Sequence, residues 1–244
     1  PKNIGSGEAF NWSRKLVPVR PDMESAAQSL GRLNDLLPLI LDTDRIDLRG
    51  VNFQGFSLSH LSFQNARLEN ASLQGAQLIE AQLNDASLRQ ANFLGADLTG
   101  ANVRGAFAHK ADFTRSCVDY ASFQGASLAF AEMASVSCRQ TNFEHADLIK
   151  TNFTAANFDT AQLQQARLTN TKLVGAVLQN TNIAGADFWL ANMSRVQLSN
   201  VECTPDTNFE GASLKGAALR SIDLADMPDV TAYISQIFAD ASVK

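Results

Sequence analysis

Histidine and cysteine are the side chains of this chain best suited to metal binding or nucleophilic catalysis, and the sequence has three of each. They are His60, His109, His145, Cys117, Cys138 and Cys203. A metal site needs ligands that converge within about 2 Å of one ion. The cysteines form no CxxC pair and cannot all pair with one another. No nucleophile–base pair, GxSxG turn or glycine-rich phosphate loop is recognisable, so we expect no enzyme, no cofactor and no metal site.

These side chains lie within a strict five-residue repeat of the sequence. Residues 91–106 read Ala-Asn-Phe-Leu-Gly, Ala-Asp-Leu-Thr-Gly and Ala-Asn-Val-Arg-Gly, followed by Ala. A bulky residue, which we call the centre, recurs at every fifth position from Leu48 to Cys203, with one exception at Ala108. One extra residue enters at 204–208, and the repeat then continues to Leu224, for 36 units in all. The residue two places before each centre is usually alanine. Internal repeats of this kind define the architecture of a chain.

A period of five fits neither an α-helix nor a flat strand. Five residues advance about 140° beyond a full helical turn, so the centres would wander around a helix. In a strand the side-chain period is two, so successive centres would point to opposite faces. The pattern fits a chain that turns a corner in every unit, with the centre and the small residue before it both pointing inward. Glycine or asparagine often stands two places after the centre, where a tight turn needs it.

These units resemble the pentapeptide-repeat family, whose pattern is Ala-(Asn/Asp)-(Leu/Phe)-x-x. The resemblance covers residues 46 to about 226. It implies an all-β fold, a right-handed quadrilateral parallel β-helix with four pentapeptides per coil, hence about nine coils in a solenoid about 40 Å long. The histidines would then lie at corners on different sides. Cys138 and Cys203 would be small core residues, Ala108 would mark a local defect, and a leucine at Ala96 would overpack the interior.

Open ends of a β-helix need covers, because a terminal coil exposes core and unpaired backbone. We therefore divide the chain into an N-terminal extension with a capping helix (1–43), the repeat (44–226) and a C-terminal capping helix (227–244). The first helix is expected within Asp22–Leu37. The second follows a helical i, i+3, i+4 spacing, with dimerisation as the alternative role. Its apolar residues are Val230, Tyr233, Ile234, Ile237 and Phe238.

A set of outward-facing apolar residues is the best candidate for a functional surface. It consists of Phe107, Phe130, Ile149, Trp189 and Leu190. All five belong to units of one column, so they should line one side of the rod. Contiguous exposed apolar residues usually mark an interface, although each could also be a tolerated surface residue. The sequence therefore favours a scaffold for an unidentified protein partner, with a homodimer as one form of that partner.

A second hypothesis comes from the family resemblance. Some members resemble a DNA duplex in shape and charge, bind type II topoisomerases such as gyrase, and protect them from quinolone-type inhibitors. B-DNA carries one charge per about 1.7 Å, so a mimic 40 Å long would need about two dozen. Residues 45–226 contain 17 acidic and 14 basic residues, and the first 32 units carry no projecting loop. The near balance of acidic and basic residues and the lack of a projecting loop both argue against gyrase binding by DNA mimicry.

Net charge and hydropathy argue against two further classes of function, nucleic-acid binding and membrane binding. The net charge of −5 argues against direct nucleic-acid or anionic-membrane binding. No apolar run reaches the roughly 18 residues of a membrane span. A cytoplasmic location is expected. Because the chain starts at Pro1, a removed leader or an upstream membrane anchor is the alternative.

Overall fold

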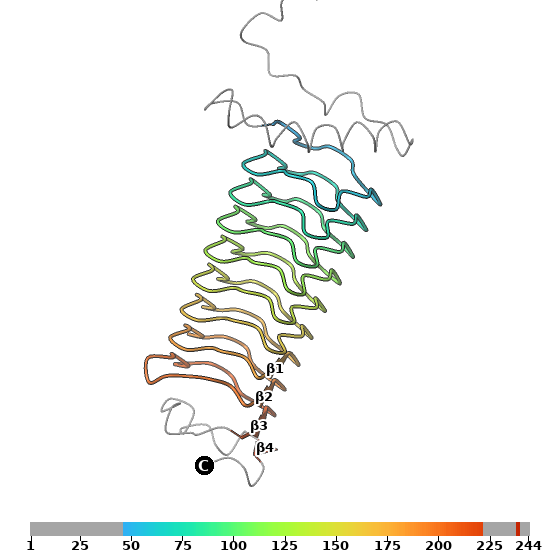
Figure 1. Cartoon of the computed structure of the whole chain (residues 1–244). Helices are drawn as coiled ribbons and strands as arrows, with labels where there is room; N and C mark the ends of the chain where they lie inside the picture. The colour runs from blue at the N-terminus through green and yellow to red at the C-terminus, as the bar shows by residue number, and fades with distance from the viewer. Residues whose placement is uncertain (1–45, 222–237, 240–244) are drawn as a thin grey trace, which may run out of the picture.

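The repeat region winds into a stack of coils. The computed structural model describes residues 46–221 and residues 238–239. Within 46–221 the coils lie one on another along an elongated rod (Figure 1). Along most of the rod the residue before each centre pairs in parallel with the residue twenty positions later, as in the series Ser87, Phe107 and Ser127. Twenty residues contain four five-residue units, so each coil has four sides and the expected parallel β-helix is confirmed.

Most pairings along the rod are single bridges, and continuous strands occur only near its C-terminal end. These strands are β1 (Val177–Gln179), β2 (Gln197–Ser199), β3 (Ala218–Arg220) and β4 (Phe238–Ala239). They form one parallel sheet in the order β1-β2-β3-β4 (Figure 1). Leu178 pairs with Leu198 twenty residues on, whereas Leu198 pairs with Leu219, which is twenty-one residues on. The extra residue expected at 204–208 is thus absorbed within one coil without disturbing the next.

Outside residues 204–208, the corners are tight turns whose third residue has a positive φ. In one such turn the Ala66 N–H donates to Phe63 O over 3.0 Å, and Asn65 between them has φ of 59°. A positive φ at this position suits glycine or asparagine. The Asn or Asp that precedes many centres supports the same turn from outside. The Asn92 Oδ1 atom, for example, accepts a hydrogen bond from the Leu94 N–H over 2.9 Å.

The four sides are named here by one outward residue each. The Phe107 face has its centres at every twentieth residue from Leu48 to Phe188 and then at Phe209. The Lys172 face begins at Phe53, the Asp119 face at Leu58 and the Asn102 face at Phe63, each with the same twenty-residue step.

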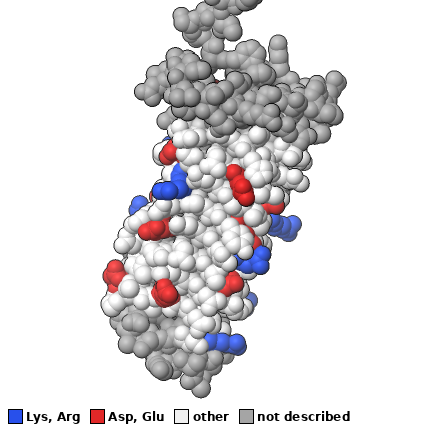
Figure 2. Space-filling model, in the orientation of Figure 1, with Lys and Arg blue, Asp and Glu red and all other residues white. Residues whose placement is uncertain are grey.

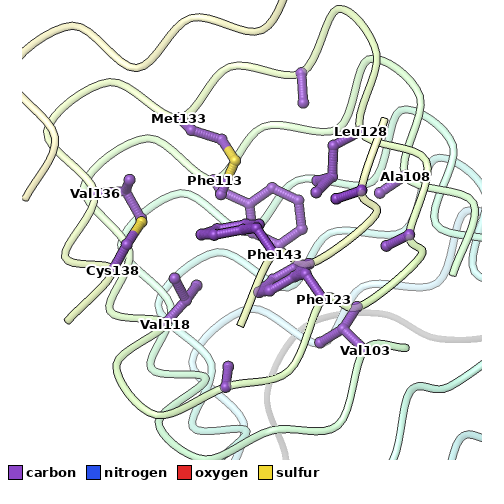
Figure 3. Close-up of a cluster of buried hydrophobic side chains, with 14 of the residues drawn as sticks. Val103, Ala108, Phe113, Val118, Phe123, Leu128, Met133, Val136, Cys138 and Phe143 are labelled. Carbon is purple, nitrogen blue, oxygen red and sulfur yellow. The ribbon is translucent and has the colours of Figure 1, made fainter. Parts of the chain in front are cut away.

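The interior is filled by the centres and the small residues before them. The centres from Leu48 to Leu198 are buried. Near the middle of the rod, phenylalanine rings from different walls meet on the axis (Figure 3). The Phe123 ring stacks on Phe143 at 5.3 Å between centroids and meets Phe113 edge-on at 5.8 Å. Such ring pairs add to the stabilisation that burial provides.

Two sequence expectations about the core need correction. Ala108 is fully buried, and the bridges on either side of it keep the twenty-residue register, so it marks no slip of the coil. Large rings of Phe113 and Phe123 lie in the same part of the interior (Figure 3). Cys203 is only partly buried, since it stands next to the extra residue. Cys138 is a core residue as expected, and burial raises the pKa of its thiol well above the usual value.

Buried threonines replace alanine at several inward positions, and the structure satisfies each hydroxyl in the same way. Each Oγ1 donates to a centre carbonyl twenty-three residues earlier. The pairs are Thr141 with Val118, Thr151 with Leu128, Thr171 with Leu148 and Thr181 with Phe158. These bonds remove the cost of burying a hydroxyl without a partner, so threonine is tolerated in an interior otherwise lined by alanine.

The expected caps fall mostly outside the described residues. This holds for Asp22–Leu37 and for Val230, Tyr233, Ile234 and Ile237, and the division at 43 and 226 stays a prediction. The prediction of a C-terminal helix is wrong at Phe238, because this residue lies in strand β4 and pairs with Ala218. Leu219 pairs with Ala239 twenty residues on, so β4 continues the coil register. The backbone edge of the preceding coil offers hydrogen bonds to an added strand. The spacing of apolar residues predicts a helix from local sequence alone and therefore does not show that a strand can form there instead.

Candidate interaction surface

The structure does not gather the histidines and cysteines into a site. His60 lies on the Asp119 face, His109 on the Phe107 face and His145 on the Asn102 face. His60 Nδ1 is 3.3 Å from Glu80 Oε2, and His145 Nε2 is 3.5 Å from Glu144 Oε1. Within the described part of the chain, no three His, Cys, Asp or Glu side chains are arranged to hold a metal ion. Nor does any helix of the described residues have the length and hydropathy of a membrane span.

A buried carboxylate on the Asp119 face joins two successive coils. The side chain of Asp119 is only 4% exposed. Its Oδ2 accepts from Arg139 Nε over 2.9 Å and lies 2.8 Å from Arg139 Nη2. Its Oδ1 accepts from the Arg139 N–H over 2.9 Å and from Ser137 Oγ over 2.6 Å. The hydrogen bond to Asp119 raises the pKa of Arg139.

This arrangement indicates that Asp119 stabilises the contact between two coils and does not act as a catalytic acid. Four donors already surround the Asp119 carboxylate, and an Arg–carboxylate fork is a strong, geometrically specific contact. Sequence reasoning missed it, because Asp119 occupies an outward position where the repeat predicts exposure. The only signal was the presence of Arg139 twenty residues later on the same face.

The structure places all five candidate interface residues on the Phe107 face. Phe107, Phe130, Trp189 and Leu190 are between 41% and 45% exposed, and Ile149 is half-buried. The register of the face follows Phe107, Ser127, Asp147 and Arg167 through successive coils. The face therefore presents large apolar side chains to solvent at several levels of the rod.

These residues fall into two groups rather than one continuous patch. We define the Phe130 cluster as Phe107, His109, Ala129, Phe130, Ile149 and Lys150, which come from three successive coils. The His109 ring meets Phe130 edge-on at 5.2 Å between centroids, and Lys150 Nζ lies 5.2 Å from the Phe130 ring centroid. Trp189 and Leu190 form the second group, and the coil between the two groups presents Arg167, Thr169 and Asn170.

Leu190 is held in place by the coil that follows it. Its N–H donates to Glu210 O over 3.0 Å. A Cβ atom added to Gly211 would lie 2.6 Å from Leu190 Cδ2, so the leucine side chain lies directly over this glycine. Gly211 has φ of +68°, which side-chain-bearing residues adopt at a cost.

We therefore expect Gly211→Ala to lower the free energy of unfolding by about 2 kcal/mol, from backbone strain plus displacement of Leu190. Gly75→Ala is the matched control, since Gly75 has φ of +63° and open space around its Cβ. In a Leu190→Ala background the cost of Gly211→Ala should fall to that of the control. Chemical denaturation of the four variants measures the coupling, and equal costs in both backgrounds would contradict this packing.

One exposed aromatic residue is not among the predicted surface residues. Tyr120 is 59% exposed at a corner of the Asp119 face. An aromatic residue at a corner position was visible in the repeat and could have been noted there. It stands on the side of the rod opposite the Phe107 face, with no other large exposed apolar residue on its own face among the described residues. Tyr120 is thus a natural control for the Phe107 face.

Charges are distributed unevenly around the rod. Within residues 46–221 the Asp119 and Asn102 faces together carry 8 acidic and 3 basic residues, whereas the Phe107 and Lys172 faces carry 7 acidic and 10 basic residues. Figure 2 shows acidic and basic groups interspersed over the visible side of the molecule. The described surface therefore has no continuous single-sign stripe on that side.

One family model and several solved structures are similar to this chain. The family model described as pentapeptide repeats matches in eight copies, over residues 46–81, 76–115, 121–159 and 161–200. No curated protein sequence gives a match. One similar solved structure is HetL, a pentapeptide repeat protein involved in heterocyst differentiation regulation from the cyanobacterium Nostoc sp. strain PCC 7120. It shows 23% identity over 77% of this chain and 95% of that chain, with a TM-score of 0.45.

Two further solved structures are similar at lower identity. QnrB1, a plasmid-mediated fluoroquinolone resistance protein, is 16% identical over 81% of this chain and 90% of that chain, with a TM-score of 0.44. Rfr23, a pentapeptide repeat protein from the cyanobacterium Cyanothece 51142, is 18% identical over 87% of this chain and 97% of that chain, with a TM-score of 0.18. At these values the likenesses say nothing about a partner of this chain.

Proposed function

Because the chain belongs to the pentapeptide repeat family, we propose that it is a non-enzymatic scaffold that binds a protein partner through the Phe107 face. The observation that carries this proposal is the gathering of exposed apolar side chains on one side of a rod. Four of the five large apolar residues that are exposed among the described residues lie on this face. Aromatic residues are enriched at the centres of protein interfaces, where a few anchors supply most of the binding energy.

The backbone does not distinguish this face. Phe130 and Leu190 stand at corners with φ of 62° and 55°, but the same conformation recurs at non-glycine corners on all four sides of the rod, for example at Tyr120 with 61° and Arg115 with 57°. It is therefore the clustering of exposed apolar side chains that singles out the Phe107 face.

The test is a triple variant, Phe107→Ser, Phe130→Ser and Trp189→Ser, in the full chain. We expect it to keep the circular dichroism spectrum of the parent, because all three side chains point outward. It should retain less than about a tenth of the partner protein that the parent captures from its native extract, as measured by quantitative mass spectrometry. Tyr120→Ser is the control and should capture normally. Equal capture by the triple variant and the parent would remove the basis of the proposal.

DNA mimicry is the competing proposal. The acidic balance of the Asp119 and Asn102 faces favours it. Eight acidic residues are far fewer than a duplex of the same length carries, and Arg139 neutralises Asp119. A supercoiling assay with purified gyrase separates the two proposals. Dose-dependent inhibition or drug protection supports mimicry, whereas the scaffold should be inert.

A cytoplasmic location belongs to the same proposal. Cys117 and Cys138 are free thiols. Unpaired cysteines are usual in a reducing compartment, which supports a partner in the same compartment.

A further inference from the structure

The Phe130 cluster lies in a locally basic part of the molecule. Between residues 86 and 170 the Phe107 face carries four basic residues and one acidic residue. They are Arg89, Lys110, Lys150, Arg167 and Asp147. Arg167 Nη1 lies 3.7 Å from Asp147 Oδ2, so these two charges offset each other. This leaves three cations on the face.

None of the three remaining cations is neutralised within the rod. Arg89, Lys110 and Lys150 are exposed and form no ion pair with any residue in 46–221. The same stretch of chain contains 15 acidic and 13 basic residues. The Phe107 face therefore offers uncompensated positive charge around apolar side chains on a molecule that is otherwise slightly acidic.

We propose that the Phe130 cluster docks an acidic polypeptide segment that carries an apolar anchor. The anchor packs on Phe107 and Phe130, and carboxylates of the segment pair with Lys110 and Lys150. This inference rests on the proposed scaffold function and names the chemistry of its partner. Electrostatic complementarity of this kind supplies specificity and speeds association.

The corner residues of the Phe107 face set the spacing that such a segment needs. Phe130 stands between Lys110 and Lys150 in one column, because the Lys110 N–H donates to Ala129 O and the Phe130 N–H donates to Ile149 O. Neighbouring coils are about 4.8 Å apart, so the two lysines are separated by about 10 Å along the rod. In a polyproline II segment, which has three residues per turn and rises about 3.1 Å per residue, side chains three positions apart point to the same side and are about 9 Å apart. An acidic residue at every third position with an apolar residue between matches this column.

A polypeptide fits the cluster better than a nucleic acid does. A nucleic-acid strand carries a charge on every nucleotide and its binding depends on many cations. The Phe107 face has only three uncompensated cations, and the chain as a whole has a net charge of −5. A segment with a few carboxylates and an apolar anchor makes use of both the charges and the rings.

The experiment uses the full chain and a fluorescein-labelled synthetic peptide with glutamate at every third position and leucine or phenylalanine between. A matched peptide has glutamine in place of glutamate. By fluorescence anisotropy at low salt, the glutamate peptide should bind at least about tenfold more tightly, and most of that difference should disappear at about 0.5 M NaCl. Lys110→Gln with Lys150→Gln should weaken the glutamate peptide about fivefold or more.

Lys172→Gln with Lys215→Gln is the control, since it removes the same charge from the neighbouring Lys172 face. It should leave binding within about twofold of the parent. Equal binding of the two peptides, no binding of either, or an equal loss in the control overturns the inference. So does tighter binding of oligothymidylate through Lys110 and Lys150, which would assign a nucleic acid. Self-association in sedimentation velocity that is lost in the Lys110 and Lys150 variant would assign a second copy of the chain instead.

The two proposals fail in different ways. If the triple serine variant loses its captured partner while neither lysine variant nor peptide charge matters, the scaffold stands and the acidic segment is wrong. If the triple serine variant captures its partner normally, the scaffold function at this face is wrong whatever the peptides do.

Discussion

Replacing Phe123 with alanine should lower the free energy of unfolding by about 3–5 kcal/mol. The Phe123 ring is fully buried, stacks on Phe143 and meets the edge of Phe113. Its removal loses buried apolar area and leaves a cavity that four hydrogen-bonded walls cannot close. Chemical denaturation followed by circular dichroism measures the change. Hydrogen exchange at the amides of the neighbouring coils would show whether those coils open first, as expected when each repeat contacts only its neighbours.

Phe107→Ala is the matched control, because the same substitution is made at an exposed ring on the Phe107 face. It should change the free energy of unfolding by about 0.5 kcal/mol or less. The difference between the two variants therefore isolates the contribution of the interior. If Phe123→Ala costs no more than Phe107→Ala, the rings that meet on the axis do not hold the coils together.

Replacing Ala96 with leucine should be about as damaging, at roughly 3 kcal/mol, through overpacking rather than through a cavity. Ala96 points inward on the Asp119 face and is almost fully buried. The Ala96 N–H donates to Phe93 O over 2.9 Å, which fixes the backbone of this corner. Because each wall is tied to the coils above and below it, the wall cannot move outward to accept a larger side chain. Thermal and chemical denaturation measure the loss.

A graded series makes this second prediction sharper. Valine already occupies the equivalent inward position at Val136 and Val196 on the same face, and both are buried. Ala96→Val should therefore cost about 1 kcal/mol or less. Ala134→Leu is the control, since Ala134 points outward on the Lys172 face and is only half-buried; it should be nearly neutral. A leucine at Ala96 that is tolerated as well as one at Ala134 would show that the interior has spare volume.

Much of the candidate surface could be predicted from the repeat, but its division into the Phe130 cluster and a second group could not. The five-residue period places Phe107, Phe130 and Trp189 on one side, and the structure does the same. Whether they touch depends on how far each side chain reaches across a coil. Lys150 extends over Phe130 and His109 meets it from the other side, whereas the coil that presents Arg167 and Thr169 separates Trp189 from them. The period alone carries no information about such lateral contacts.

The sequence by itself determined the path of the backbone. A bulky residue at every fifth position, a small one two places before it and a turn-forming residue two places after it are local requirements, and each can be recognised within a single unit. The turn in every unit, the buried centres and the position of the extra residue at 204–208 follow from them, whereas four units per coil is what the resemblance to the pentapeptide-repeat family implied.

Only the tertiary structure decided the contacts between residues that are about twenty positions apart. Asp119 is buried because Arg139 and Ser137 on the next coil surround it with donors, and Thr151 is satisfied by the carbonyl of Leu128. Phe238 lies in a strand because the edge of β3 offers hydrogen bonds that its own apolar spacing does not foretell. The physical reason is common to all three. A hydrogen bond between coils depends on both partners and on their distance in space, whereas a periodic pattern describes one residue at a time.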